Sequence, residues 1–369
     1  MALLMLLSII PPYRKGMLTM TAESSLELIA KYSKAVNERP LDPEAWKDRG
    51  LAYYNAGELD LSIADCTRAI EINPQYLEAW LDRGKSYYSK NEPDKALSDF
   101  NRILEMNPDY FKAYTNRGII YDERGEHDRA ISEFTKSLEL NPKFGKTYHN
   151  RGVAYRAKGD PNRAIEDFTK AIELKPDLAE AYNERGCAYN EILECDCAIE
   201  DFTKAAELRP DFAEAYNNRG VSHDMLYAFL EAISDYSKAI ELRPDYKEAY
   251  NNRAVTYQKI DDYERAMADF KSALRLDPRY AEAYINRAMY LLSLDEPRIA
   301  FEDLKKAIEI APSKALAYYN MAIACEELKA YREAVENYRR FLQLSPSGEE
   351  KVILEVKERI EKITAEQGI

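Results

Sequence analysis

Asparagine recurs through this 369-residue chain at a fixed spacing of 34 residues. The side-chain amide of asparagine carries one hydrogen-bond acceptor and two donors. A row of such amides can bind the backbone of an extended peptide, whatever side chains that peptide carries. The alternatives are neutral solvated side chains, or bonds between neighbouring repeats. The candidate peptide-binding residues are one row of Asn116, Asn150, Asn218, Asn252, Asn286 and Asn320, and a second row, one position earlier, of Asn183, Asn217 and Asn251.

Arginine forms another column with the same spacing, and an acidic residue follows each arginine by 16 residues. The arginines are Arg49, Arg83, Arg117, Arg151, Arg185, Arg219, Arg253 and Arg287, and the acids are Asp65, Asp99, Glu133, Asp167, Asp201, Asp235, Asp269 and Asp303. The ninth copy has Met321 and Asn337 instead, so both charges are lost together. This joint loss predicts a partly buried, bidentate ion pair within each repeat. A basic ladder for an acidic ligand is the alternative.

Patterns that would indicate catalysis or a cofactor are missing from the sequence. The three histidines stand at different repeat positions, and there is no phosphate-binding glycine loop or H-E-x-x-H motif. Cys187, Cys195 and Cys197 form one cluster, for which packing is favoured over a metal or redox role. We therefore expect no enzyme activity, no cofactor and no metal site. The odd total of five cysteines argues against a disulfide scaffold and favours a reducing, cytoplasmic location.

The net charge of the chain limits its possible partners. The formal charge is −13 at pH 7. Nucleic-acid affinity rests mainly on lysine and arginine contacts to phosphate, so a nucleic-acid partner is disfavoured. An anionic membrane surface is disfavoured for the same reason. The apolar run MALLMLLSII at the start is too short to span a bilayer as a helix. We expect a disordered or mis-assigned leader, with an export or anchoring segment as the alternative.

The elements that position these columns follow from the 34-residue period itself. Ten prolines mark it without insertion or deletion: Pro40, Pro74, Pro108, Pro142, Pro176, Pro210, Pro244, Pro278, Pro312 and Pro346. With Pro43 as position 1, position 4 is always aromatic, position 8 is glycine or alanine, and position 20 is alanine in all copies but the first. Positions 4, 8 and 11 share one helical face, and positions 20, 24 and 27 share a face of a second helix. The sequence therefore predicts a helix–turn–helix unit in each repeat.

The pattern of an aromatic residue, a small residue and tyrosine, followed by alanine, an aromatic residue and proline, resembles the tetratricopeptide repeat family. The resemblance implies an all-α, right-handed superhelical solenoid of helix–turn–helix repeats, whose first helices line a concave groove. We assign residues 1–22 to the leader, 23–42 to an N-terminal half-repeat helix, 43–348 to nine repeats, and 349–369 to a C-terminal capping helix and tail.

The function implied by this resemblance is a scaffold or adaptor for protein–protein interaction. A protein or peptide partner, either an extended peptide or a partner helix, would bind in the concave groove. The alternative is a regulatory or oligomerisation array of a larger multiprotein assembly, with self-association of the chain.

Overall fold

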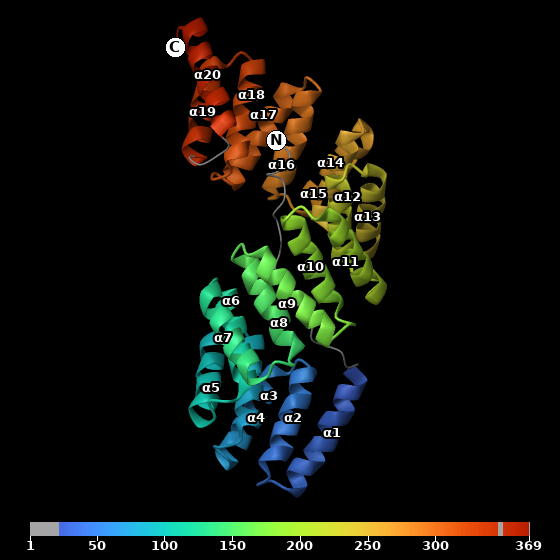
Figure 1. The fold of residues 1–369 in the computed structure, drawn as a ribbon, viewed down its shortest axis with the longest axis vertical. Helices are drawn as coiled ribbons and strands as arrows, with labels where there is room; N and C mark the ends of the chain where they lie inside the picture. Colours follow the sequence, from blue (N-terminus) through green and yellow to red (C-terminus); the bar gives the residue numbers. More distant parts are fainter. Residues whose placement is uncertain (1–21, 346–349, 369) are drawn as a thin grey trace. The chain divides into compact units, whose positions relative to one another are not determined.

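The structure is a computed structural model that describes residues 22–345 and 350–368. Within these ranges the chain forms twenty α-helices and no strand, so the predicted all-α fold class is confirmed (Figure 1). None of these helices is long and apolar enough to cross a bilayer. The leader predicted for residues 1–22 falls on residues outside the described ranges, except for Ala22, and Pro346 of the proline series also lies outside them.

Each repeat contributes a first helix of 13 residues and a second helix of 14 residues. The first helices are α2 (Pro43–Asn55), α4 (Leu77–Ser89), α6 (Phe111–Glu123), α8 (Gly145–Ala157), α10 (Ala179–Glu191), α12 (Ala213–Met225), α14 (Lys247–Lys259), α16 (Ala281–Ser293) and α18 (Ala315–Glu327). The second helices are α3 (Leu59–Ile72), α5 (Pro93–Met106), α7 (His127–Leu140), α9 (Pro161–Leu174), α11 (Cys195–Leu208), α13 (Phe229–Leu242), α15 (Tyr263–Leu276), α17 (Pro297–Ile310) and α19 (Tyr331–Leu344). The helix α1 (Ala22–Glu38) precedes them and α20 (Glu350–Gln367) follows them.

The chain divides into two compact units, residues 1–176 and residues 177–369. The first unit contains α1 to α9, and the second contains α10 to α20. The unbroken proline spacing runs through this division without a change of length, so nothing in the period indicates it. Within each unit, the second helix of a repeat packs against the first helix of the next.

The two helices of a repeat approach closely because position 8 is small. A Cβ atom added to Gly84 would lie 2.5 Å from Cε1 of Phe100, at position 24 of the same repeat. The same distance is 2.6 Å between Gly118 and Phe134. Both rings are 1% exposed, so the absent side chain at position 8 makes room for a fully buried aromatic side chain at position 24.

The turn between the two helices depends on a left-handed residue at position 15. Gly57, Gly125 and Gly159 have φ between 74° and 82° there, a conformation that favours glycine after a helix C-terminus. The other six repeats keep the left-handed conformation without glycine, with φ between 58° and 65° at Asn91, Leu193, Tyr227, Asp261, Asp295 and Lys329. The backbone N–H of position 16 closes the turn on the carbonyl of position 11, for example from Glu194 to Tyr189 at 2.9 Å. This closing bond holds the turn even where the residue is unsuited to it.

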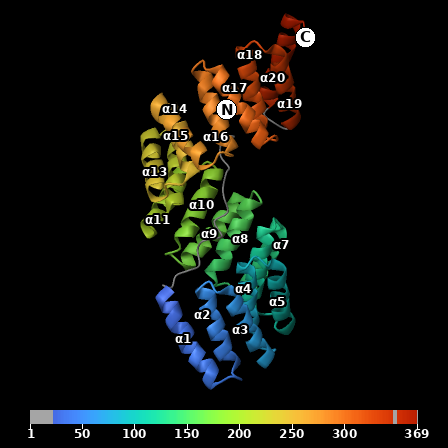
Figure 2. The same cartoon turned by 180° about the vertical axis from the view of Figure 1, so that it is seen from behind.

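The helix α20 covers the end of the second unit (Figure 2). Val356 and Ile363 on this helix are buried in one cluster with Val335 and Tyr338 of α19. Val352 and Ile360 pack against the same cluster, so the four residues form one apolar face. A polar outer face on such a terminal helix keeps the last repeat soluble.

Candidate functional site

The two asparagine rows are joined to each other by hydrogen bonds between consecutive first helices of the second unit. The amide Nδ2 of three position-6 asparagines donates to Oδ1 of the position-5 asparagine in the preceding repeat. The three bonds are Asn218 to Asn183 at 3.1 Å, Asn252 to Asn217 at 3.2 Å, and Asn286 to Asn251 at 3.1 Å. They connect α12 to α10, α14 to α12 and α16 to α14. The first helices therefore share one face, and the amides fix the register along it.

Part of this network forms a continuous relay of side-chain amides. Asn217 donates from Nδ2 to Oδ1 of Asn218 at 3.3 Å, within the same helix. Asn218 also contacts Sγ of Cys187 at 3.5 Å. At the other end, Asn183 donates to Oε1 of Glu184 at 3.5 Å. The relay gives each amide a defined orientation, because every donor in it points at an acceptor of known position.

The nine candidate asparagines differ in their exposure to solvent. Asn150, Asn183, Asn217, Asn251 and Asn320 are buried, at 2% to 6% of their full exposure. Asn116, Asn218, Asn252 and Asn286 are half-buried, so part of each side chain is open to solvent. Asn116 and Asn320 instead donate to carbonyls of their own helices, Lys112 at 2.7 Å and Leu316 at 2.9 Å.

Two half-buried amides keep an open acceptor. The Oδ1 atoms of Asn252 and Asn286 accept no hydrogen bond from the described residues, although their Nδ2 groups are held by the preceding repeat. One helical turn along, Val255 and Met289 at position 9 are also half-buried and pack at the margins of the core. The face therefore combines oriented amide oxygens with small apolar surfaces.

The arginine column forms the predicted ion pairs in all eight repeats that carry it. In each pair Nε and Nη2 of arginine donate to the two oxygens of the acid 16 residues later, at 2.6 to 2.9 Å. The arginine side chains are 14% to 21% exposed. This prediction is confirmed, and the column is a structural element between the two helices of a repeat.

Each arginine also makes contacts that the sequence analysis missed. In five repeats Nη1 donates to position 25 of the preceding repeat, as Arg83 does to Thr67 at 3.2 Å. Arg253 donates in this way to Ser237 at 2.8 Å. Its guanidinium carbon also lies 5.8 Å from the ring centres of Tyr250 and Tyr257. A hydroxyl or amide 16 residues before these five arginines was the available signal for the inter-repeat bond.

These contacts keep the arginine charged in a partly buried place. Burial opposes the charge on Arg253, but the hydrogen bonds from its guanidinium to Asp269, together with the attraction of that carboxylate, raise its pKa. The same ordering of effects raises the pKa of Arg83 beside Asp99. Both oxygens of the carboxylate accept from the arginine, and Nε, Nη2 and, in five repeats, Nη1 of the guanidinium already donate within the array, so the column offers little to an acidic ligand.

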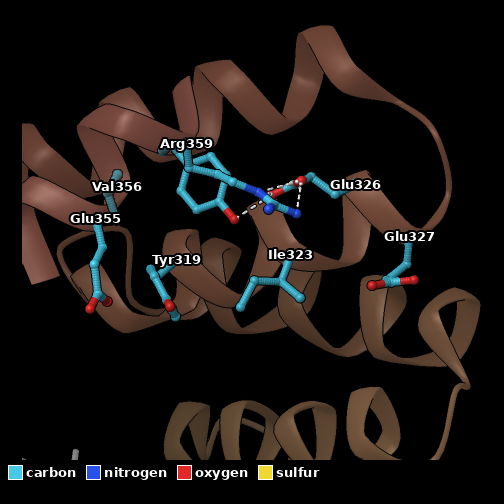
Figure 3. Close-up of a pocket in the computed structure, with 8 residues that line it drawn as sticks. Tyr319, Ile323, Glu326, Glu327, Glu355, Val356 and Arg359 are labelled. Atoms are coloured by element: carbon cyan, nitrogen blue, oxygen red, sulfur yellow. Dashed lines mark hydrogen bonds and ion pairs between the residues drawn. The ribbon is translucent and has the colours of Figure 1, made fainter. Parts of the chain in front are cut away.

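The ninth repeat replaces the missing ion pair with contacts to the capping helix (Figure 3). Glu326 accepts hydrogen bonds from Tyr338 at 2.6 Å and from Nε of Arg359 at 2.8 Å, and Arg359 lies on α20. These side chains line a pocket together with Tyr319 and Ile323. Burial raises the pKa of Tyr338, and its hydrogen bond to Glu326 adds to this. The cluster attaches the cap to the last repeat.

The cysteines and histidines show no metal-binding arrangement in the part of the chain that the structure describes. No three histidine, cysteine or acidic side chains there are grouped so that they could hold a metal ion. All five cysteines are free thiols, and Cys195 is buried while Cys197 is exposed.

Sequence models of the tetratricopeptide repeat match most of the array. Three of the matches cover residues 43–76, 145–178 and 248–280, and two longer ones cover residues 81–143 and 285–349. A related repeat model matches residues 229–261. Together these matches cover more than half of the chain, so the chain belongs to the tetratricopeptide repeat family. No curated protein sequence matches the chain.

Solved structures with the same fold include long tetratricopeptide arrays. The crystal structure of yeast Tom70 is 17% identical, with a TM-score of 0.56, and the match covers 94% of this chain and 93% of that one. The hetero-tetramer Cut9–Hcn1 of the APC/C is 16% identical, with a TM-score of 0.57, covering 92% and 82%. A tetratricopeptide repeat protein from Parabacteroides merdae ATCC 43184 is 22% identical, with a TM-score of 0.57, covering 68% and 99%. These likenesses show the α-solenoid fold.

Proposed function

We propose that this chain is a non-enzymatic protein-interaction scaffold that binds an extended peptide along the first helices of its second unit. Membership of the tetratricopeptide repeat family supports a scaffold role in general. The proposed binding residues are Asn218, Asn252 and Asn286, which are half-buried and held in one row. The buried asparagines of position 5 act as positioning residues.

The observation that carries the proposal is the fixed direction of these amides. The Nδ2 groups of Asn252 and Asn286 are bonded to the preceding repeat, so their Oδ1 atoms are the groups left for a ligand. An extended peptide presents backbone N–H groups on alternating sides, and such groups match a row of oriented acceptors. The half-buried Val255 and Met289 provide apolar surface for the side chains of the peptide.

The proposal includes a reducing, cytoplasmic location and a partner other than nucleic acid. The five free thiols support the first statement. The formal charge of −13 supports the second, since phosphate contacts require lysine and arginine.

The test uses peptides selected from a random 12-residue library on the full chain. The triple variant Asn218→Ala, Asn252→Ala and Asn286→Ala should weaken their binding about 30-fold in fluorescence anisotropy, since the hydrogen bonds to the open acceptors of Asn252 and Asn286 contribute about 1 kcal/mol each. The comparison variant Asn217→Ala with Asn251→Ala breaks two of the same inter-repeat bonds but leaves the exposed amides in place, so it should lose less affinity than the triple variant.

Two outcomes would contradict the proposal. Equal loss of binding in the control and in the triple variant would mean that the asparagines serve only to hold the repeats together. A peptide methylated on its backbone nitrogens that binds as tightly as the parent would exclude backbone recognition. Self-association that rises with concentration in light scattering, without peptide binding, would instead favour the oligomerisation array.

A further inference from the structure

The turns between the two helices of a repeat change character from the first unit to the second. In repeats two, three and four, position 14 is a cation that pairs with an aspartate at position 18 of the preceding repeat. These pairs are Lys90 with Asp60, Arg124 with Asp94, and Lys158 with Asp128. In the next three repeats position 14 is Ile192, Leu226 and Ile260, and the sixth repeat has Leu230 at position 18. An edge of ion pairs is thus replaced by an apolar edge.

The apolar side chains of the second unit are strongly exposed along this edge. Tyr227 is 77% exposed, Leu230 73% and Leu193 58%. Side chains of this size and exposure on successive repeats indicate a contact surface, because a soluble chain seldom leaves such a row in water. We define the apolar edge as Leu193, Leu226, Tyr227, Leu230, Ile260 and Tyr263.

Contacts between repeats make the edge continuous. Lys259, from the seventh repeat, has its Nζ 5.6 Å from the ring centre of Phe229, which follows the turn of the sixth repeat. The same lysine forms an ion pair with Asp224 of the sixth repeat. In the other direction, Ser222 of the sixth repeat donates to Oδ1 of Asn190 in the fifth at 3.0 Å. The turns of repeats five, six and seven therefore lie next to one another.

The backbone at two of these turns is unfavourable for the residues that occupy it. Leu193 and Tyr227 have φ of 65° and 60°, in the left-handed region that large side chains rarely adopt. At the same position the first unit has Gly57, Gly125 and Gly159, and Asn91 in the remaining repeat. Strained residues of this kind tend to mark functional surfaces. Leucine and tyrosine at this position bring large apolar groups to the tip of the turn, where glycine would be easier to accommodate.

The charges around the apolar edge select its partner. Glu194, Asp196, Glu231 and Asp261 are exposed beside it and form no ion pair with any described residue. The cations nearby are already used, since Lys259 pairs with Asp224 and Arg265 with Asp262 at 2.9 Å. A second copy of this edge would bring acids against acids, and an anionic membrane would be repelled.

We propose that the apolar edge is a second docking surface, separate from the asparagine face, for a protein segment that carries leucine-like side chains interleaved with lysine or arginine. The apolar side chains of the segment would cover Tyr227 and Leu230, and its cations would meet Glu194, Asp196 and Glu231. This inference does not depend on peptide binding by the asparagines.

The test uses two labelled 18-residue helical peptides, one of leucine and lysine and one of leucine and glutamate, on the full chain. The leucine–lysine peptide should bind at least tenfold more tightly. The variant Leu193→Gly, Tyr227→Gly and Leu230→Ser keeps every charge and should lose at least tenfold in affinity. Two of its changes place glycine where the backbone favours it, so its melting temperature should not fall. The control Asn91→Gly makes the same backbone change in the first unit and should bind like the wild type.

Several results would overturn the inference. Equal binding of both peptides would show that the acids beside the edge do not select the partner. Binding that survives the apolar variant, which keeps every charge, would show a purely electrostatic attraction. A wild-type dimer that the variant abolishes would assign the edge to a second copy of the chain. Co-sedimentation with phosphatidylcholine vesicles would assign it to a membrane. Loss of the leucine–lysine peptide in the Asn218→Ala, Asn252→Ala and Asn286→Ala variant would place this peptide on the asparagine face. If the apolar variant fails to fold, the variant Glu194→Gln with Glu231→Gln tests the inference instead. It should weaken binding of the leucine–lysine peptide without changing the backbone, and unchanged binding would contradict the inference.

Discussion

The pair of Arg253 and Asp269 allows a quantitative test of the arginine column. The ninth repeat provides the template, because it has Met321 and Asn337 at the same two positions. We therefore consider Arg253→Met, Asp269→Asn and the variant with both changes. If the column is a structural ion pair, the double variant should be more stable than Arg253→Met alone.

The expected magnitudes follow from what each change leaves behind. The Asp269 side chain is 8% exposed and receives both of its hydrogen bonds from Arg253, so Arg253→Met leaves a buried charge without a donor and should cost about 3 kcal/mol. Arg253 is 18% exposed and keeps its bond to Ser237, so Asp269→Asn should cost about 2 kcal/mol. The double variant removes both charges and should cost about 2 kcal/mol, which gives a coupling of about 3 kcal/mol.

The free energy of unfolding is measured by urea denaturation followed by far-UV circular dichroism. Amide hydrogen exchange in α14 and α15 measures the local stability around the pair. Lys238→Ala is the control, because its ion pair with Glu241 is exposed on both sides and its loss should change nothing measurable. If the costs of the two single variants simply add in the double variant, to within about 0.5 kcal/mol, the two groups do not act as a pair and the reasoning is refuted.

Three further predictions concern single positions. Gly125→Ala should cost about 1 kcal/mol in thermal unfolding, because its φ of 74° disfavours a side chain although nothing lies within 4 Å of the added Cβ. Gly84→Ala should cost about 1–3 kcal/mol of unfolding free energy, because the added Cβ would overlap Phe100. Adding Phe100→Leu copies the pairing of alanine and leucine in the eighth repeat and should recover part of that loss. No recovery would exclude overpacking as the cause. Cys197 is exposed and should react with a thiol reagent in the native protein. Cys66 should react only after unfolding, because Cys66 is buried and burial raises the pKa of its thiol. Mass spectrometry of the labelled sites would show which cysteine reacts first.

Much of the architecture could be predicted because the same physical requirement is repeated nine times. A small residue at position 8 and an aromatic residue at position 24 recur together, and Gly84 with Phe100 shows that the two groups fill one space. The pairing of arginine with an acid could also be predicted, since Met321 and Asn337 lose both charges at once. Comparison between repeats of one chain thus identified contacts within a repeat.

The candidate site was less accessible to such reasoning. Counting at 34-residue intervals identified both asparagine rows, but it did not show which row is buried. Asn217, at position 5, is buried, whereas Asn252, at position 6 of the next repeat, is half-buried. These two positions differ by about 100° around the helix. Whether that angle points toward a neighbour or toward solvent depends on how the next helix is placed. The bond of 3.2 Å between their amides is a consequence of that placement.

The sequence by itself determined the period, the two helices of each repeat, and the charges that pair inside a repeat, because these depend on residues close in the chain and on patterns repeated along it. Only the tertiary structure decided which amides are exposed, which repeat each arginine also bonds, and where the chain divides into two units. The left-handed turns at Leu193 and Tyr227 were also decided only by the tertiary structure. Their backbone is set by the packing of the two helices they join, which outweighs the preference of the individual residue.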